Sequence, residues 1–337
     1  MAESLWKRIS DLPLEIDSYE LERLEQPVTR GFTRVTTLVR LLGAGEEGLG
    51  EDVTWYAEAH ERELAAGAVL PLAGSWTLES FSAALTVDEP HRRWAYESAA
   101  IDLALRQAGR SLAGVLGREP QPVEFVVSPG LGDPPKAEPL RRFLALYPGL
   151  RFKLDPSNSW TDELIAELAA TGAVVTVDLK AYYAQDAVPH DPELYRRIAA
   201  AFSEALIEDP AQSPETLAVL EPHRDRVTWD APIHSIADVE QLPWRPKTLN
   251  SKPSRFGRVQ ELLDFYDWTA HEGIELYGGG MFELGPGRGQ IQYLASLFHP
   301  GAPNDVAPGA FNAPEPQPGL PQSPLPPPNG SAPGFRG

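Results

Sequence analysis

Short apolar runs alternate with helix-like segments through the middle of the chain, from about residue 122 to residue 277. Five of the runs end on a charged residue, and these last residues are 22 to 30 positions apart. The runs cover residues 150–155, 173–178, 205–208, 226–230 and 247–252. A repeat of this size, in which a helix follows each strand, is one βα unit of a parallel sheet. The pattern therefore predicts successive parallel strands that are connected by helices.

Helix starts are marked between these runs. Thr161 is a candidate N-cap, and Asp191 and Ser213 each precede a proline that suits a first helical turn. Residues 259–266 repeat apolar side chains with helical spacing. The two ends of the alternation are a strand at residues 123–128 with a helix at 138–145, and a strand at 274–277. Seven strands in this order predict an α/β barrel, closed by a weakly marked eighth strand or by the N-terminal segments.

The first 118 residues show a different pattern of apolar and polar positions, which predicts an α+β fold. Residues 33–42 are rich in β-branched side chains and predict a strand, and the glycines of residues 48–50 predict a turn. A helix is predicted at residues 52–64. The longest helix is predicted at about residues 91–115, where apolar positions recur with helical spacing and Gly117 follows as a stop signal.

The last 25 residues hold nine prolines and almost no large apolar side chains. Such a segment cannot bury enough apolar surface to offset the entropy lost on ordering. The sequence therefore predicts an α+β domain at residues 1–118, a barrel domain at residues 119–312 and a disordered, proline-rich tail at residues 313–337.

The composition narrows the range of functions. The 337 residues carry 29 basic and 48 acidic side chains, a formal net charge of −19, which argues against nucleic acid or an anionic membrane as a partner. The absence of cysteine excludes disulfides, thiolate metal sites and cysteine nucleophiles. We find no apolar run typical of a signal peptide or a membrane span, so a cytoplasmic location is expected by default.

The charged residues at the ends of the runs are candidates for a common site. The strands of a parallel βα barrel all open on one face at their carboxyl ends, so these side chains are expected to converge there. Asp178, Glu208 and Asp230 end consecutive strands, and clustered carboxylates repel one another unless a cation neutralises them. Mg²⁺ combines a few protein oxygens with water and substrate oxygens. We therefore predict that the three carboxylates bind Mg²⁺, with Lys153 and Lys252 on either side.

Lysines beside such a metal suggest proton transfer. A lysine that is crowded by a metal and partly removed from water can have its pKa lowered enough to act as a base. A metal bound to a substrate carboxylate would stabilise the enediolate that forms when the α-proton leaves. The predicted chemistry is therefore abstraction of an α-proton from a small-molecule carboxylate.

Several segments, taken in order, carry a family resemblance. They are Glu97-Ser-Ala-Ala-Ile-Asp-Leu-Ala-Leu105, Lys153-Leu-Asp155, Val177-Asp178, Ile207-Glu208-Asp-Pro210, Trp229-Asp230, Asn250-Ser-Lys252-Pro-Ser-Arg-Phe-Gly257 and Met281-Phe-Glu283. From about Tyr19 to His299 the chain resembles the enolase superfamily, of the muconate-lactonising and mandelate-racemase type. The resemblance implies an α+β capping domain over a modified (β/α)7β barrel of the TIM type. It also implies Mg²⁺, bound at the ends of the third, fourth and fifth strands, and proton abstraction next to a carboxylate.

The lysine on strand six is similar to the muconate-lactonising branch, which includes o-succinylbenzoate synthases and dipeptide epimerases. The chain departs from the pattern of that branch at three positions. Asp155 stands where the branch carries the second, catalytic lysine of Lys-x-Lys on strand two. Lys180 replaces an asparagine, and Asp209 replaces the glutamine of Glu-Gln-Pro. A racemase needs acid and base groups on both faces of the carbanion, so loss of the second lysine favours a one-base reaction from Lys252.

The predicted function is a Mg²⁺-dependent lyase or isomerase that works by β-elimination or cycloisomerisation. Lys252 is the predicted base, Lys153 holds the substrate carboxylate, and Asp155 positions the substrate or relays a proton. Two alternatives stay open. One is an acid-sugar dehydratase, in which Asp155 would be the general acid. The other is a catalytically silent relative that binds a metal and a carboxylate ligand.

Four further residues are candidates for substrate binding. Glu283 lies in the glycine-rich segment after the seventh strand, where the backbone can approach a ligand closely. The same glycines suggest a phosphate cradle, although no dinucleotide fingerprint precedes them. Lys180 either contacts substrate or pairs with a metal-ligand carboxylate. Residues 26–34 are expected to form a mobile loop over the site, with Arg30 and Arg34 as specificity residues. The resemblance also allows a homo-oligomer.

Overall fold

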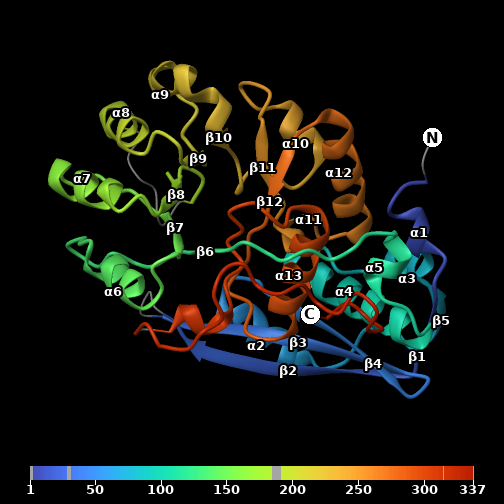
Figure 1. Cartoon of the computed structure of the whole chain (residues 1–337). Helices are drawn as coiled ribbons and strands as arrows, with labels where there is room; N and C mark the ends of the chain where they lie inside the picture. Colours follow the sequence, from blue (N-terminus) through green and yellow to red (C-terminus); the bar gives the residue numbers. More distant parts are fainter. Residues whose placement is uncertain (1–2, 29–31, 184–190, 314, 337) are drawn as a thin grey trace.

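The computed structural model describes residues 3–28, 32–183, 191–313 and 315–336 (Figure 1). Its helices are α1 Lys7–Ser10, α2 Ala57–Ala66, α3 Leu78–Ala84, α4 Pro90–Gln107, α5 Leu112–Leu116, α6 Glu138–Leu146, α7 Asp162–Ala170, α8 Pro192–Ala201, α9 Pro214–Leu220, α10 Ile236–Glu240, α11 Pro253–Phe256, α12 Val259–Glu272 and α13 Pro286–Phe298, with 3₁₀ turns at Glu221–Arg226 and Gly309–Asn312. Its strands are β1 Pro13–Ile16, β2 Ser18–Pro27, β3 Thr33–Gly43, β4 Glu46–Asp52, β5 Gly74–Thr77, β6 Val126–Val127, β7 Arg151–Leu154, β8 Val174–Asp178, β9 Leu206–Glu208, β10 Val227–Thr228, β11 Thr248–Asn250 and β12 Glu275–Tyr277.

The N-terminal part is an antiparallel sheet in the order β2-β3-β4, packed against the long helix α4. The predicted strand at residues 33–42 is confirmed as β3. The turn predicted at residues 48–50 is wrong, because Gly48 and Gly50 lie inside β4. A Cβ atom at Gly48 would lie 2.1 Å from the carbonyl oxygen of Ala99, and one at Gly50 would lie 1.9 Å from that of Ala95. The two glycines therefore serve close packing of α4 on the sheet, and not chain reversal.

The helix predicted at residues 91–115 is two helices. α4 ends at Gln107, and α5 begins after Ser111, whose hydroxyl accepts the backbone N–H of Gly114 as an N-cap. Gly109 between them has φ +62°, a left-handed conformation that ends a helix readily. The apolar period continues through this break because both helices pack on the same core.

The central part contains a five-stranded parallel sheet in the order β10-β9-β8-β7-β6. Helices α6, α7, α8 and α9 lie along its outer side in Figure 1. The predicted helix starts are confirmed: Thr161, Asp191 and Ser213 each accept a backbone N–H from the first turn of α7, α8 and α9. Along the strands, buried Phe152 and Val177 alternate with the polar residues that form the site described below.

A second parallel pair, β11 and β12, continues this arrangement. The Asn250 N–H donates to the carbonyl of Trp229 (3.2 Å), which links β11 to the end of β10. On the other side, single parallel bridges join Gly279 to Asp305 and Asn304 to Phe125. Residues 304–305 therefore lie between the end of β12 and the segment that contains β6. In the described part of the chain the parallel strands form two separate sheets, and no closed barrel is seen.

The structure differs from the disordered tail that the composition predicts for residues 313–337. From residue 315 to residue 336 the chain crosses the molecule from the parallel sheet to α4 (Figure 1). Leu325 exchanges backbone hydrogen bonds with Val123, and the carbonyl of Gly334 accepts the N–H of Leu112. Phe335 is 1% exposed. A few buried residues therefore anchor this segment. The average composition of the segment does not reveal them, which is why it predicts disorder.

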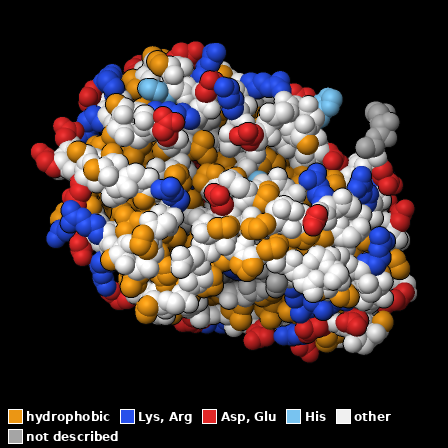
Figure 2. Space-filling view, in the orientation of Figure 1, with side chains coloured by type: hydrophobic (Ala, Val, Ile, Leu, Met, Phe, Trp, Pro, Cys, Tyr) orange, Lys and Arg blue, Asp and Glu red, His pale blue; other side chains and the backbone are white. Residues whose placement is uncertain are grey.

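Among the described residues, no helix is both long and apolar enough to span a membrane. Figure 2 shows acidic and basic side chains mixed around the face in view, with apolar groups between them.

Candidate active site

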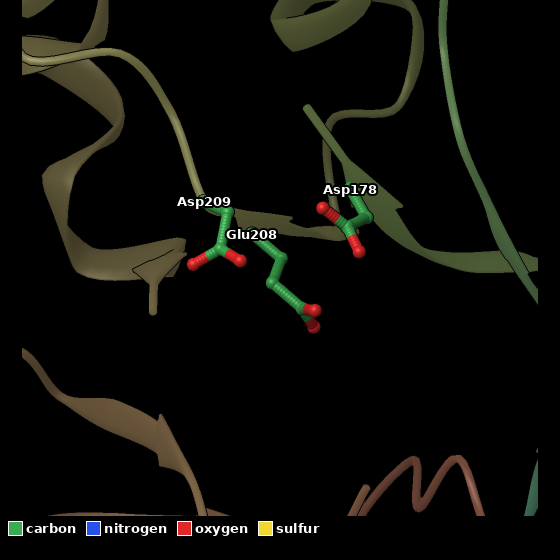
Figure 3. Close-up of side chains that lie close together, drawn as sticks. All are labelled: Asp178, Glu208 and Asp209. Atoms are coloured by element: carbon green, nitrogen blue, oxygen red, sulfur yellow. The ribbon is translucent and has the colours of Figure 1, made fainter. Parts of the chain in front are cut away.

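Asp178 and Glu208 lie side by side at the carboxyl ends of β8 and β9, where they are register partners. Both are fully buried. Figure 3 shows their carboxylates gathered with that of Asp209, the residue after Glu208. One carboxylate oxygen from each of the three residues lies within 4.8 Å of the others, a grouping that can hold a metal ion.

Lys153 of β7 joins the two strand-end carboxylates. Its ammonium donates to Glu208 Oε1, and it lies 3.0 Å from Asp178 Oδ2 and 3.9 Å from Asp305 Oδ2. Burial lowers the pKa of Lys153, but Asp178 and Glu208 outweigh burial, so the net pKa is raised well above its ordinary value. Lys153 is therefore a fixed positive charge at the centre of the site.

The carboxylates still carry more negative charge than Lys153 compensates. Burial raises the pKa of Glu208, and although Lys153 opposes this, Asp178 and Asp230 add to the rise, so the net pKa lies well above its usual range. Burial also raises the pKa of Asp178, but Lys153 and Lys180 outweigh it and the net pKa falls. The two neighbours differ because Asp178 has two ammonium partners and Glu208 has one. The second oxygen of Glu208 accepts the hydroxyl of Tyr277 (2.6 Å).

Asp230 follows β10 and forms a second group with Lys252 and Arg255. Lys252 donates to Asp230 Oδ2 (2.9 Å), and Arg255 donates to Oδ1 (2.8 Å). Burial lowers the pKa of Lys252 and the Arg255 charge lowers it further, so that the net pKa is lowered despite Asp230. Lys252 and Lys153 are thus shifted in opposite directions. Arg255 lies in α11, three residues after Lys252, and was not among the predicted residues.

Asp209 is a site residue that the sequence reasoning treated only as a departure from a motif. Its carboxylate accepts the backbone N–H groups of Asp230 (2.8 Å) and Ala231 (3.0 Å). Burial, with Asp178 and Asp230 nearby, raises its pKa to about 7. The cluster that can hold a metal among the described residues contains Asp209, whereas the predicted third ligand was Asp230. The signal for Asp209 was its position beside Glu208.

Lys180 and Asp155 lie together at the ends of β8 and β7. The Lys180 ammonium donates to Asp178 Oδ2 (2.7 Å) and lies 3.7 Å from Asp155 Oδ1. Lys180 has φ +54° and Asp209 has φ +50°, uncommon backbone conformations for these residue types. Such conformations are often found at functional sites.

Two features on the rim complete this side of the site. Asp155 lines an open pocket of about 660 Å³ between the loops that follow β6 and β7. The Tyr183 ring lies over the Lys180 ammonium at 5.0 Å, and its hydroxyl accepts a hydrogen bond from Arg255 (3.0 Å). Tyr183 therefore connects the Asp178 and Asp230 groups, a role that its sequence position does not reveal.

Glu283 is buried in the glycine-rich loop. It accepts the backbone N–H of Met281 (2.7 Å) and lies 3.0 Å from the Arg288 guanidinium. Gly279 of the same loop packs against the site directly, since a Cβ atom there would lie 3.1 Å from Cε of Lys252. The loop thus approaches the candidate base closely, while the approach to a ligand that its glycines predict stays a prediction.

The two arginines predicted to set specificity have different outcomes. Arg34 is fully buried in β3, where its guanidinium donates to the carbonyl groups of Val53, Thr54 and Trp55. These donors of Arg34 are thus used by backbone carbonyl groups, and its role in specificity stays a prediction. Arg30 lies outside the described residues.

The clustered side chains have the chemistry of ligands to a divalent metal. All three clustered side chains offer hard carboxylate oxygens, which suit Mg²⁺. Burial is the main cause of the raised pKa of Glu208, and the neighbouring Asp178 and Asp230 add to it; a dication would offset their repulsion. The residues present therefore fit a hard divalent cation.

Comparison with solved structures defines the fold class. A member of the enolase superfamily from Listeria innocua is 19% identical, with a TM-score of 0.66 over 88% of this chain and 86% of that one. Muconate cycloisomerase from Pseudomonas fluorescens is 20% identical, with a TM-score of 0.66 over 87% of each chain. The predicted resemblance is confirmed: the structural neighbours are enolase superfamily members, and their α/β fold with an N-terminal capping domain is the fold of this chain.

Comparison of sequences defines the family. An N-succinylamino acid racemase from Thermus thermophilus is 28% identical over 326 residues, which cover 87% of this chain and 86% of that protein. Residues 119–313 match the family model described as "Domain of unknown function (DUF8230) C-terminal domain", and residues 7–115 match its N-terminal counterpart. The chain belongs to the DUF8230 family.

Proposed function

We propose that this protein is a Mg²⁺-dependent enzyme that abstracts the α-proton of a small-molecule carboxylate and completes the reaction by β-elimination or cycloisomerisation. The observation that carries the proposal is the pair of oppositely shifted lysines around buried carboxylates at the ends of parallel strands. Enolase superfamily enzymes generally use a divalent metal. A bound dication would supply positive charge beside the substrate carboxylate.

The contacts of each charged residue indicate its role in this proposal. Asp178 and Glu208 would hold the metal, with Asp209 or Asp230 as the third ligand. Asp209 holds the backbone at Asp230, and through it the partner of Lys252. Lys153 is encircled by carboxylates and would stay charged, which suits it to bind a substrate carboxylate. In the described part of the chain Lys252 pairs with one carboxylate, that of Asp230, which it shares with Arg255, and this suits Lys252 to accept a proton.

We propose the domain division at the same points as the sequence does. Residues 1–118 form the α+β capping domain, and residues 119–312 form a modified (β/α)7β barrel whose eighth position is taken by residues 304–305. The bridges from Gly279 to Asp305 and from Asn304 to Phe125 support this closure. We expect the enzyme to work in the cytoplasm on a free small molecule.

The substrate is the least constrained part of the proposal. The relative from Thermus thermophilus is named for N-succinylamino acids, so N-acylamino acids with a second carboxylate are candidates here. That relative is named as a racemase, a reaction that needs proton transfer on both faces of the carbanion. Asp155 stands where the related branch has its second lysine, which is why we favour a one-base outcome for this chain.

Solvent exchange is the direct test. The protein is incubated in D₂O with Mg²⁺ and a library of N-succinylamino acids, dipeptides, acid sugars and cyclohexadiene carboxylates, and products are read by mass spectrometry. We expect deuterium incorporation or mass loss for one class, reduced about 100-fold or more in Lys252→Ala, because a positioned general base contributes at least that much. Lys247→Ala is the matched control, since Lys247 is 64% exposed at the start of the same segment.

Three outcomes separate the proposals. Exchange that persists in Lys252→Ala contradicts the role given to Lys252. Absence of exchange, with Mg²⁺ binding that Glu208→Gln abolishes in calorimetry, supports a catalytically silent binder instead. That alternative rests on a specific observation: Asp155 stands where the related branch has its second, catalytic lysine. Absence of Mg²⁺ binding contradicts both.

A further inference from the structure

A buried carboxylate of the N-terminal part is inserted into the glycine-rich loop beside the site. Glu51 lies near the end of β4 and is 0% exposed. Three of its hydrogen-bond donors are the backbone N–H groups of Leu284, Gly285 and Gly287, more than 230 residues away along the chain. The contact therefore joins the N-terminal sheet to the loop that follows β12.

Glu51 receives four hydrogen bonds. The backbone N–H of Leu284 donates to Oε1 (2.6 Å), and those of Gly285 and Gly287 donate to Oε2 (2.9 and 3.0 Å). The Thr36 hydroxyl also donates to Oε1 (2.8 Å). The three backbone donors lie at the start of α13, where unpaired N–H groups and the helix dipole favour an anion.

The glycines of this segment make room for the carboxylate. A Cβ atom at Gly287 would lie 2.9 Å from Glu51 Oε2, and one at Gly285 would lie 3.3 Å from it. Any larger residue at Gly287 would press on the carboxylate oxygen. The loop that suggested a phosphate cradle in the sequence is thus an anion cradle, and the chain's own Glu51 occupies it.

The other end of the same loop forms the wall of the candidate active site. Gly279 packs on Lys252, and Glu283 fixes the backbone N–H of Met281 two residues further on. Leu284 follows directly and binds Glu51. A short, continuous stretch of backbone therefore connects the cradle to the lysine.

We propose that the backbone N–H groups of residues 284–287 form a binding site for a small carboxylate, that Glu51 is its built-in ligand, and that Glu51 thereby positions the loop against Lys252. Glu51 touches no reacting group and is a positioning residue. Burial and the neighbouring Glu283 raise the pKa of Glu51, and the hydrogen bonds from Leu284, Thr36 and Gly285 oppose that rise without cancelling it. The inference does not depend on which reaction the site catalyses.

Hydrogen exchange on the full-length protein tests the proposal without an activity assay. The loop peptide spanning residues 282–288 is compared in the wild type and in Glu51→Ala, each with sodium formate or with sodium chloride at equal ionic strength. We expect its amides to exchange about tenfold faster or more in Glu51→Ala, since hydrogen bonds to a charged group are among the strongest in proteins and their loss favours local opening. Formate, but not chloride, should restore slow exchange by filling the vacated cradle.

Two further variants keep the test decisive. In Glu51→Gln the amide NH₂ faces N–H donors, so exchange should quicken, but formate should have no effect because the cradle is still filled. Gly287→Ala should quicken exchange like Glu51→Ala, and the two changes combined should do little more than either alone. Glu46→Ala, at an exposed residue of the same strand, should leave the loop unchanged.

Unchanged exchange in both Glu51 variants would overturn the positioning role. Faster exchange in Glu51→Ala that formate does not reverse would overturn the anion site. If Glu51→Ala does not fold in chloride but folds in formate, the proposal is supported. If it folds in neither salt and Glu51→Gln exchanges like the wild type, the proposal is overturned.

Discussion

Replacing Lys153 by Met is expected to destabilise the protein by about 3–5 kcal/mol when no divalent cation is present, because removing one partner of a buried ion pair leaves uncompensated charge. Lys153 contacts both Asp178 and Glu208, and all three side chains are buried. Methionine fills a similar volume without charge, so the loss reports on electrostatics more than on packing. The midpoint and slope of urea unfolding in chelator would measure it.

The same variant should become more dependent on metal than the wild type. With Lys153 absent, a dication is the remaining source of charge that can approach Asp178 and Glu208 together. A ligand that binds only the folded state raises the free energy of unfolding by about 2.7 kcal/mol at a concentration 100 times its Kd. We therefore expect Mg²⁺ to raise the unfolding midpoint more in Lys153→Met than in the wild type.

Lys247→Met provides the control, because the exposed pair of Lys247 with Asp225 should contribute little. Equal responses to Mg²⁺ in the wild type and in Lys153→Met would show that Lys153 and a metal do not share these carboxylates. An unchanged midpoint in chelator would show that the buried carboxylates are neutral without Lys153.

The strand-end residues of the site could be predicted because the period of a βα repeat fixes where charged residues fall. Lys153, Asp178 and Glu208 each sit at the carboxyl end of a strand, and parallel strands bring such ends to one face. The N-caps at Thr161 and Ser213 were equally readable, since their chemistry is local.

The roles of residues whose partners are distant along the chain could not be predicted from the sequence in the same way. Asp209 acts on the backbone of the next strand, and Glu51 acts on a loop more than 200 residues away. Arg34 has the charge of a ligand-binding residue, but its donors are used by backbone carbonyls of the adjacent chain segment. In each case the partner is set by packing, and no spacing in the sequence encodes it.

The C-terminal tail gives the second large expected effect. Phe335→Ala should destabilise the protein by about 3–5 kcal/mol, the usual loss when a fully buried phenylalanine is truncated. Phe335 packs edge-on against Trp94 of α4 and Tyr293 of α13, with ring centroids 6.3 and 6.0 Å apart. Its backbone N–H donates to buried Asp102 (2.8 Å). The tail therefore contributes to the core in spite of its proline-rich composition.

Urea unfolding of Phe335→Ala, of a chain ending at residue 312, and of Tyr56→Ala would measure this contribution. Tyr56 is 61% exposed, so its truncation should cost little and controls for the loss of an aromatic ring. Removal of the tail should cost at least as much stability as Phe335→Ala, since it also removes the Arg336 contacts with Asp102 and Glu47.

A peptide of residues 313–337 added to the shortened chain should restore part of the lost stability. A wild-type midpoint for the shortened chain would mean that the tail only rests on the surface. If Phe335→Ala loses as much stability as the shortened chain, the aromatic anchor accounts for most of the contribution of the tail. Prolines limit the entropy of the unfolded tail, so a few aromatic and charged anchors are then sufficient to order it.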